Sequence, residues 1–233
     1  MEIDIYASGS DGNAYRISDG KTSLLLDAGI PFRKLQEMTG HNITSLSGCL
    51  VTHEHGDHSK AVKDLTRAGV DIYTSTGTIG KLGVISHRIR TVKSLQGIVI
   101  GTFAVLPFDV EHDAAEPLGF LLTSTETGEK LLYFTDTYYL KYRFAGLTHI
   151  MAECNYDLGG LQQSVDGGNV PDFVAKRIIK SHMSLEHLKE MLKANDISKV
   201  RQIYLLHLSK NNSNAKLYRR EIQRLTGAEV YVC

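Results

Sequence analysis

The chain has 233 residues, of which 42% are hydrophobic, so it can bury a sizeable core as one large domain or two small ones. Its formal net charge is zero, which excludes an overall basic field that would attract nucleic acid. It has no apolar run long enough to span a membrane, no signal-peptide pattern, and three widely spaced cysteines that suggest no disulfide framework. We therefore expect a cytoplasmic protein.

The first part of the chain alternates strands with short helices. Helices are expected over 31–38, where Pro31 suits a first turn, and over 59–68, where Ser59 would be the N-cap. The section from about 70 to 135 is rich in strand patterns and glycine turns. The early strands are predicted at 2–6, 14–18, 22–26 and 48–52.

After residue 151 the pattern becomes mainly helical. Helices are expected over 172–179, 185–193 and 215–225, with a buried strand over 200–206 and a last strand over 229–232. Strands and helices interleave in both halves, which predicts an α/β sandwich with sheets buried between helices.

The most informative segment is Thr52-His-Glu-His-Gly-Asp-His58, which follows a buried strand. Holding three imidazoles and two carboxylates at one strand end is costly unless something binds them. Their nitrogen and oxygen ligands suit zinc, manganese or iron better than calcium. Isolated histidines are usually core or surface residues, but four ligand types at this spacing (His53, His55, Asp57 and His58) indicate a metal site.

Further ligand-type residues stand at the ends of predicted strands. Any one of them alone would more often be a turn or a solvated loop residue. Together they suggest one site, because functional residues in such sandwiches gather where buried strands run out into loops. The residues are Asp27, His112, Asp136, Glu153 and His207.

These residues, in order and rough spacing, resemble the metallo-β-lactamase superfamily over essentially the whole chain. The resemblance implies a four-layer αβ/βα sandwich, two mixed sheets flanked by helices, and a single domain over 1–233. It also implies two divalent ions, zinc or manganese. By position, the first ion would take His53, His55 and His112, and the second Asp57, His58 and His207, with Asp136 bridging them. Asp27 matches a motif that braces the histidine segment.

Three later segments resemble the nucleic-acid-processing branch, which includes the β-CASP nucleases and tRNase Z. The opening residues 7–15 and the segment 112–120 resemble the YycJ/WalJ proteins, single-domain bacterial members regarded as DNA exonucleases. The chain departs from the larger relatives in having no inserted β-CASP domain and no tRNase Z arm. The three segments are 153–157, 181–184 and 205–209.

The chemistry expected of such a site is phosphodiester hydrolysis. Two ions lower the pKa of a water and give hydroxide in place, while Asp57 both binds metal and orients it. A departing alkoxide also needs a proton, and His182 is the candidate acid, with Glu153 raising its pKa and holding its ring. A plain helix-capping role for His182 is the alternative.

Candidate phosphate contacts are weaker. Ser10 and Asn13 lie in a Gly-, Ser- and Asp-rich segment that is either an anion-binding nest or a simple turn. Lys210 and Asn211 follow His207 and precede a helix whose first amides could receive phosphate.

The predicted function is therefore a metal-dependent phosphodiesterase acting on nucleic acid, with DNA preferred to RNA. A small-molecule hydrolase of the same fold, such as a cyclic-phosphate diesterase, lactonase or thioesterase, is the alternative. A non-catalytic metal-binding regulator is a third interpretation. Residues 171–233 hold 12 Lys and Arg against 6 Asp and Glu, which favours nucleic acid, whereas the zero net charge favours the small molecule.

Overall fold

A computed structural model describes residues 1–209 and 213–233. The chain forms two compact units, each with its own strands and helices. The first unit comprises residues 1–109 and 114–129, and the second comprises 110–113 and 130–233. In the described residues no helix has both the length and the apolar character of a membrane span.

The first unit holds a six-stranded mixed sheet whose strand order follows the chain. The first three strands are antiparallel and the next three pair in parallel. These strands are β1 (Glu2–Ala7), β2 (Ala14–Ser18), β3 (Ser23–Leu26), β4 (Gly48–Leu50), β5 (Ile72–Thr74) and β6 (Ile89–Thr91). An antiparallel set follows, made of β7 (Ile98–Ile100), β8 (Phe103–Asp109) and β9 (Leu118–Ser124).

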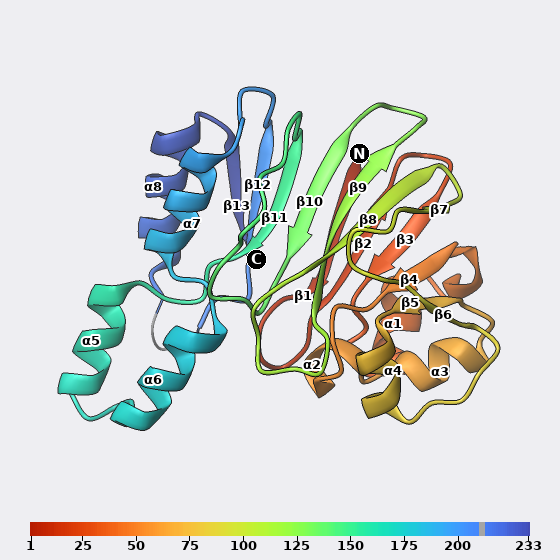
Figure 1. Ribbon diagram of the computed structural model, residues 1–233, viewed down its shortest axis with the longest axis horizontal. Helices are drawn as coiled ribbons and strands as arrows, with labels where there is room; N and C mark the ends of the chain where they lie inside the picture. Colours follow the sequence, from red (N-terminus) through yellow and green to blue (C-terminus); the bar gives the residue numbers. More distant parts are fainter. Residues whose placement is uncertain (210–212) are drawn as a thin grey trace. The chain divides into compact units, whose positions relative to one another are not determined.

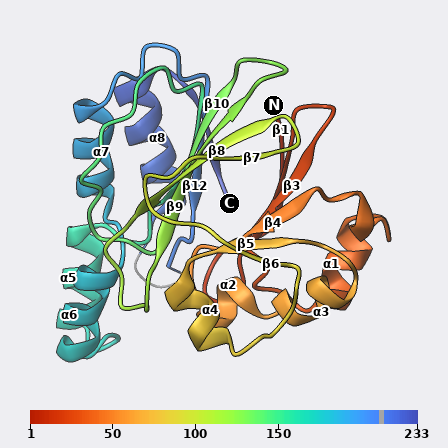
Figure 2. The same ribbon diagram turned by 45° about the vertical axis from the view of Figure 1, so that its right-hand side comes forward.

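Helices of the first unit pack their apolar side chains on this sheet. Leu35 and Leu65 are fully buried in one cluster with Leu25, Cys49 and Ile72 of the strands. Figure 2 shows the helices gathered beside β3 to β6. The elements are α1 (Phe32–Met38), the 3-10 turn η1 (Ile43–Ser45), α2 (Gly56–Ser59), α3 (Val62–Arg67) and α4 (Thr76–Leu82).

Four parallel strands form the centre of the second unit. The middle residues of the first three are buried throughout, as expected for a parallel sheet covered on its faces. The strands are β10 (Lys130–Phe134), β11 (His149–Glu153), β12 (Gln202–Leu206) and β13 (Glu229–Val232).

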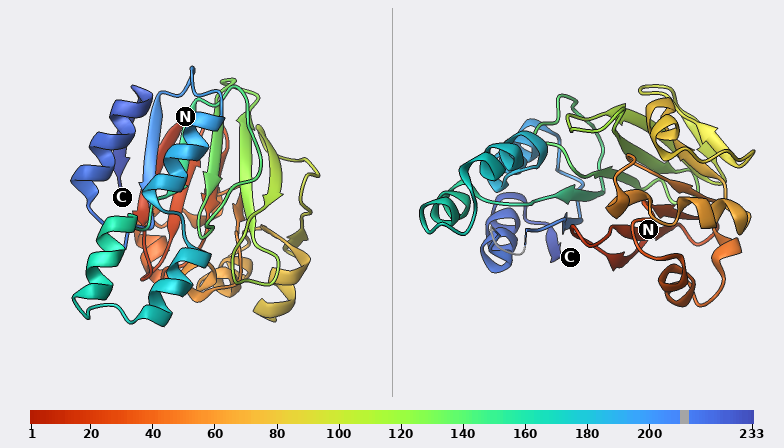
Figure 3. Two further views of the ribbon diagram at one scale, coloured as in Figure 1. Left: turned by 60° about the vertical axis from the view of Figure 1, so that its left-hand side comes forward. Right: turned by 90° about the horizontal axis from the view of Figure 1, so that it is seen from below.

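Two pairs of helices accompany these strands. Helices α7 (Leu185–Ala194) and α8 (Ala215–Thr226) run along the sheet, and α5 (Leu158–Asp166) and α6 (Asp172–Ser181) lie side by side (Figures 1 and 3). The Ser184 side chain caps α7 by accepting from the His187 amide. Leu188 and Leu192 are fully buried on the inner face of α7.

Two helical expectations need correction, and two helices were missed. The segment 59–68 is not one helix, because α2 ends at Ser59 and α3 begins at Val62. Ser59 is no N-cap, since its hydroxyl donates to the Glu54 and His55 carbonyls. Helices α4 and α5 were not expected, and both contain glycine, which weakens a helical pattern.

Candidate metal centre

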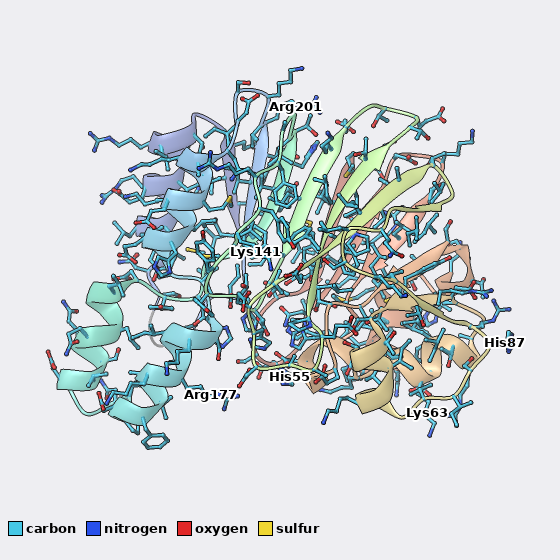
Figure 4. All side chains as sticks on the ribbon, in the orientation of Figure 1. His55, Lys63, His87, Lys141, Arg177 and Arg201 are labelled. Atoms are coloured by element: carbon cyan, nitrogen blue, oxygen red, sulfur yellow. The ribbon has the colours of Figure 1, made fainter. Side chains whose placement is uncertain are left out.

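The predicted histidine segment follows β4 in the first unit, and residues 52–58 are called the histidine loop below. His55 stands just before α2, while Asp57 and His58 lie within it. His53 and His58 are buried, with ring centroids 4.2 Å apart. His53 Nε2 lies 3.0 Å from His55 Nδ1. Figure 4 labels His55. The loop therefore gathers three imidazoles in a small volume.

Asp27, at the end of β3, braces this loop. Its carboxylate accepts the Thr52 amide at 2.8 Å and the Thr52 hydroxyl at 3.0 Å. Its Oδ2 also lies 2.8 Å from His58 Nδ1, and both side chains are fully buried. A carboxylate that accepts the Nδ1 proton fixes the ring and leaves Nε2 as the ligand atom. Thr52 was not expected as a partner, and only the tertiary contact reveals it.

Asn13 also supports the loop. Its fully buried side chain accepts from the Gly9 amide and the Tyr15 hydroxyl. Its amide nitrogen lies 3.1 Å from His58 Nε2. Asn13 therefore connects the 9–13 turn to the histidine loop, and its predicted phosphate contact stays a prediction. Ser10 is exposed in that turn.

The second unit contains the other predicted residues. Asp136, Glu153, His182 and His207 offer ligand atoms that all lie within 4.8 Å of one another. Asp136 Oδ1 lies 3.1 Å from His207 Nδ1, and Asp136 Oδ2 lies 3.7 Å from His112 Nε2. Parallel strands β10, β11 and β12 end at the same edge, which explains why residues distant in sequence meet here.

Glu153 organises this cluster. Its fully buried carboxylate places Oε1 2.6 Å from His182 Nδ1 and 3.0 Å from His207 Nδ1. Oε2 accepts the amides of Thr137 at 3.2 Å and Met183 at 3.0 Å. Burial alone would raise the pKa of Glu153, but the charge and hydrogen bond of His182 outweigh it and lower that pKa. Glu153 is therefore a carboxylate held by four donors.

The pKa values of His182 and His112 are shifted in opposite directions. Burial alone would lower the pKa of His182, but the charge and hydrogen bond of Glu153 outweigh it and raise that pKa. Burial lowers the pKa of His112, which favours the neutral ring that a metal requires. His182 caps the end of α6, two residues before the Ser184 cap of α7, and is not itself in the first turn of a helix.

Three strand-end residues adopt left-handed backbone conformations. Asp27, Asp136 and His207 have φ values of 56°, 47° and 53°. Such conformations are uncommon outside glycine and cluster at functional sites, where the surrounding structure holds them. Asn155 holds one of them, because its side-chain amide donates to the His207 carbonyl at 2.8 Å. Sequence reasoning gave Asn155 no role.

Two basic residues of α6 have acidic partners. Lys176 and Arg177 of α6 pair with Asp172 and Asp113, at 2.6 and 3.3 Å, so their charges are partly offset. Figure 4 labels Arg177. Lys210 and Asn211, predicted as phosphate contacts, lie outside the described residues.

The donor set suits a transition metal, since imidazole nitrogens and carboxylate oxygens lie close together within each unit. The fold and these donors together define a metal-dependent hydrolase. Residues 22–208 match the β-lactamase superfamily domain, and the chain belongs to this family.

Similar proteins agree with this class. The chain is 28% identical to exodeoxyribonuclease YycJ of Bacillus anthracis, over 97% of the chain and 89% of that protein. It is 29% identical to exodeoxyribonuclease WalJ of Streptococcus pneumoniae, over 93% of the chain and 85% of that protein. The metallo-β-lactamase fold protein YhfI of Bacillus subtilis superposes with a TM-score of 0.75 at 17% identity, covering 99% and 95% of the two chains. The predicted α/β class, with two mixed sheets flanked by helices, is confirmed.

Proposed function

We propose that this hydrolase is a dinuclear phosphodiesterase that removes nucleotides from DNA ends. The observation that carries the proposal is the contact of the fully buried Glu153 carboxylate with the half-buried His182 ring, with 2.6 Å between the oxygen and the nitrogen. It stands beside Asp136 and His207 at one strand edge. A hydrolase that cleaves a thioester has less need of such an acid, because a thiolate leaves without a proton. The exodeoxyribonuclease names of the relatives also support DNA as the substrate.

The proposal assigns the metal ligands as the family resemblance does. His53, His55 and His112 would hold one ion, and Asp57, His58 and His207 the other, with Asp136 shared. When bound, two such ions lower the pKa of water and offset charge on the phosphoryl oxygens. We further propose that the two units act as one domain. Its cysteines, which are free thiols, are consistent with a cytoplasmic location.

Side chains of the protein would then supply the proton that the leaving group needs. His182 donates it to the departing deoxyribose oxygen, while the Glu153 carboxylate holds the ring by its Nδ1. The remaining nitrogen, Nε2, is the one that faces the leaving group in this assignment. Asp27 and Asn155 keep the histidine loop and His207 in position.

A comparison of leaving groups tests the proposal. Purified protein with Mn²⁺ or Zn²⁺ is assayed on end-labelled linear DNA and on bis(p-nitrophenyl) phosphate. We expect Asp136→Ala to abolish both activities. We expect His182→Ala to slow DNA cleavage by about 10²–10⁴-fold. The nitrophenyl diester should be affected far less, because nitrophenolate leaves without a proton.

His87→Ala is the matched control, because His87 is an exposed histidine of the first unit (Figure 4). It should keep wild-type rates on both substrates. Turnover of the diester with DNA left intact would instead support the small-molecule hydrolase. Equal slowing of both substrates by His182→Ala would contradict the acid role.

A further inference from the structure

The segment that follows Asp136 has an unusual composition. Residues 138–144 read Tyr-Tyr-Leu-Lys-Tyr-Arg-Phe, so aromatic side chains alternate with cations directly after a proposed metal ligand. Tyr139 is 55% exposed, and Lys141 and Arg143 are also exposed. Lys141 Nζ lies 5.3 Å from the Tyr142 ring centroid. Exposed aromatic rings beside cations are typical of surfaces that bind single-stranded nucleic acid.

This segment forms one wall of a pocket in the second unit, and α7 forms the other. The cavity has a volume of about 290 Å³ and includes Tyr139, Lys141, Arg143, His187, Glu190 and Met191 in its lining. That volume is at the small end of ligand pockets, which span about 300–1,000 Å³. Figure 4 shows Lys141 next to α7. The pocket therefore suits a flat group of about one nucleobase with its sugar.

Both walls are attached to the carboxylate that holds the proposed acid. Glu153 accepts the Thr137 amide, at the start of the aromatic segment, and the Met183 amide, beside His182. The His187 ring nitrogen Nδ1 donates to the Tyr138 carbonyl at 3.1 Å and so joins α7 to the segment. A group bound in this pocket would consequently have a defined position relative to His182.

We propose that the pocket between residues 139–143 and α7 receives the terminal nucleobase of a single DNA strand. Tyr139 supplies the stacking face, and Lys141 and Arg143 meet the adjoining phosphates. The Glu190 carboxylate, which also lines the pocket, accepts a hydrogen bond from an amino group of the base. The inference rests on the proposed function, because it adds to that function the feature of the substrate that the site recognises.

Binding of oligonucleotides to metal-free protein tests the pocket without any cleavage. With a chelator present, fluorescence anisotropy measures the affinity for labelled oligo(dC), whose bases carry an amino group, for the same strand lacking its 5′- or 3′-terminal base, and for one lacking an internal base. We expect Tyr139→Ala to weaken binding of the intact strand by roughly 5- to 150-fold, the range of one base–aromatic stack. The wild-type protein should bind the strand that lacks one terminal base more weakly by a similar factor. The Tyr139→Ala variant should bind that strand and the intact strand about equally, because it has already lost the stacking contact.

Two variants serve as controls. Tyr139→Phe keeps the ring and should bind as the wild type does, and Tyr231→Ala removes a partly exposed tyrosine on β13 and should have no effect. Thermal unfolding verifies that Tyr139→Ala is folded. The proposal is overturned if Tyr139→Ala binds normally, if internal and terminal base loss act alike, or if wild type does not bind the strand. Base-dependent binding without DNA cleavage would overturn the nuclease function and leave the pocket standing.

Discussion

Individual residues of the site were largely visible in the sequence, whereas their partners were not. His53, Asp136 and His207 stand out because ligand-type side chains follow apolar strand patterns. The sequence could not show that Glu153 contacts both His182 and His207, since those contacts join β11, β12 and the turn after α6. Hydrogen-bond partners depend on distances across the fold, which a single sequence does not contain.

Asp19 illustrates a residue-scale contact that sequence reasoning missed. It lies in the β2–β3 turn, where its carboxylate accepts the Thr22 amide at 2.9 Å. The Thr102 and Ser124 hydroxyls also donate to it, at 2.6 and 2.7 Å, and so tie this turn to the ends of β8 and β9. Burial would raise its pKa, but these hydrogen bonds outweigh burial and lower the pKa of Asp19 to about 2.

A pH dependence of stability follows from this lowered pKa. Because the folded-state pKa is below the ordinary value, the contribution is complete above about pH 4 and is lost as pH falls through about 2. After allowance for solvent screening, we expect Asp19→Asn to cost about 1–2 kcal/mol at pH 7 and almost nothing near pH 2. Urea unfolding at both pH values measures the difference. The exposed Glu126→Gln should change stability by less than about 0.5 kcal/mol, and a pH-independent loss in Asp19→Asn would contradict the assignment.

At the scale of elements, apolar runs predicted most strands within a residue or two, because a buried strand requires them. The prediction of helices failed where the intrinsic helix propensity of the residues is low. Helix α4 begins Thr-Gly-Thr and α5 begins Leu-Gly-Gly, yet both form with a side-chain cap, from Ser75 and Asp157. The break between α2 and α3 was also missed, since the Ala61 amide donates to the Ala28 carbonyl of the turn after β3 instead of to the preceding helical turn.

One close approach between elements explains how the histidine loop is held. A Cβ on Gly29, in the turn after β3, would lie 1.6 Å from the Asp57 carbonyl oxygen. That carbonyl accepts the Asn13 amide at 2.7 Å, and the His58 carbonyl accepts the Ala28 amide at 2.8 Å. Only glycine lets the turn and the loop meet at this distance.

Two glycine variants test this packing. Gly29→Ala should displace the Asp57 backbone, weaken metal binding by about 10–100-fold and destabilise the fold by about 1–3 kcal/mol. Gly56→Ala lies inside the histidine loop, but its added methyl group meets nothing within 4 Å, so metal binding should be retained. Competition with a chromogenic chelator measures the affinities. Similar losses in the two variants would show that the loop is sensitive to any methyl group, not to this contact.

At the scale of the whole molecule, the family and its function class were recognisable because their ligand motifs recur along the chain from Asp27 to His207. The division into two compact units was not recognisable from the sequence, since it depends on the density of contacts in three dimensions. The proposed ligands are drawn from both units, which gives metal binding a consequence for global stability.

We expect Zn²⁺ or Mn²⁺ to stabilise the entire chain. Metal that binds only the folded state adds about 2.7 kcal/mol per site when free metal is a hundredfold above the dissociation constant. Unfolding should therefore shift to higher temperature with metal and to lower temperature with a chelator, in one transition that includes both units. Scanning calorimetry with metal analysis of the dialysed protein measures the shift and the stoichiometry.

Ligand variants from the two units make this prediction specific. His53→Ala in the first unit and His207→Ala in the second should each lower the bound metal from two ions toward one, since each belongs to a different proposed ion. Asp136→Ala removes the shared ligand, so it should lower the occupancy of both metal sites and abolish most of the stabilisation by metal. His87→Ala should behave as wild type does. If His53→Ala left metal content and unfolding temperature unchanged, the first unit would contribute no ligand through this residue. The assignment of the first ion would then have to be rebuilt on residues of the second unit, where His112, Asp136 and Glu153 already offer nitrogen and oxygen donors.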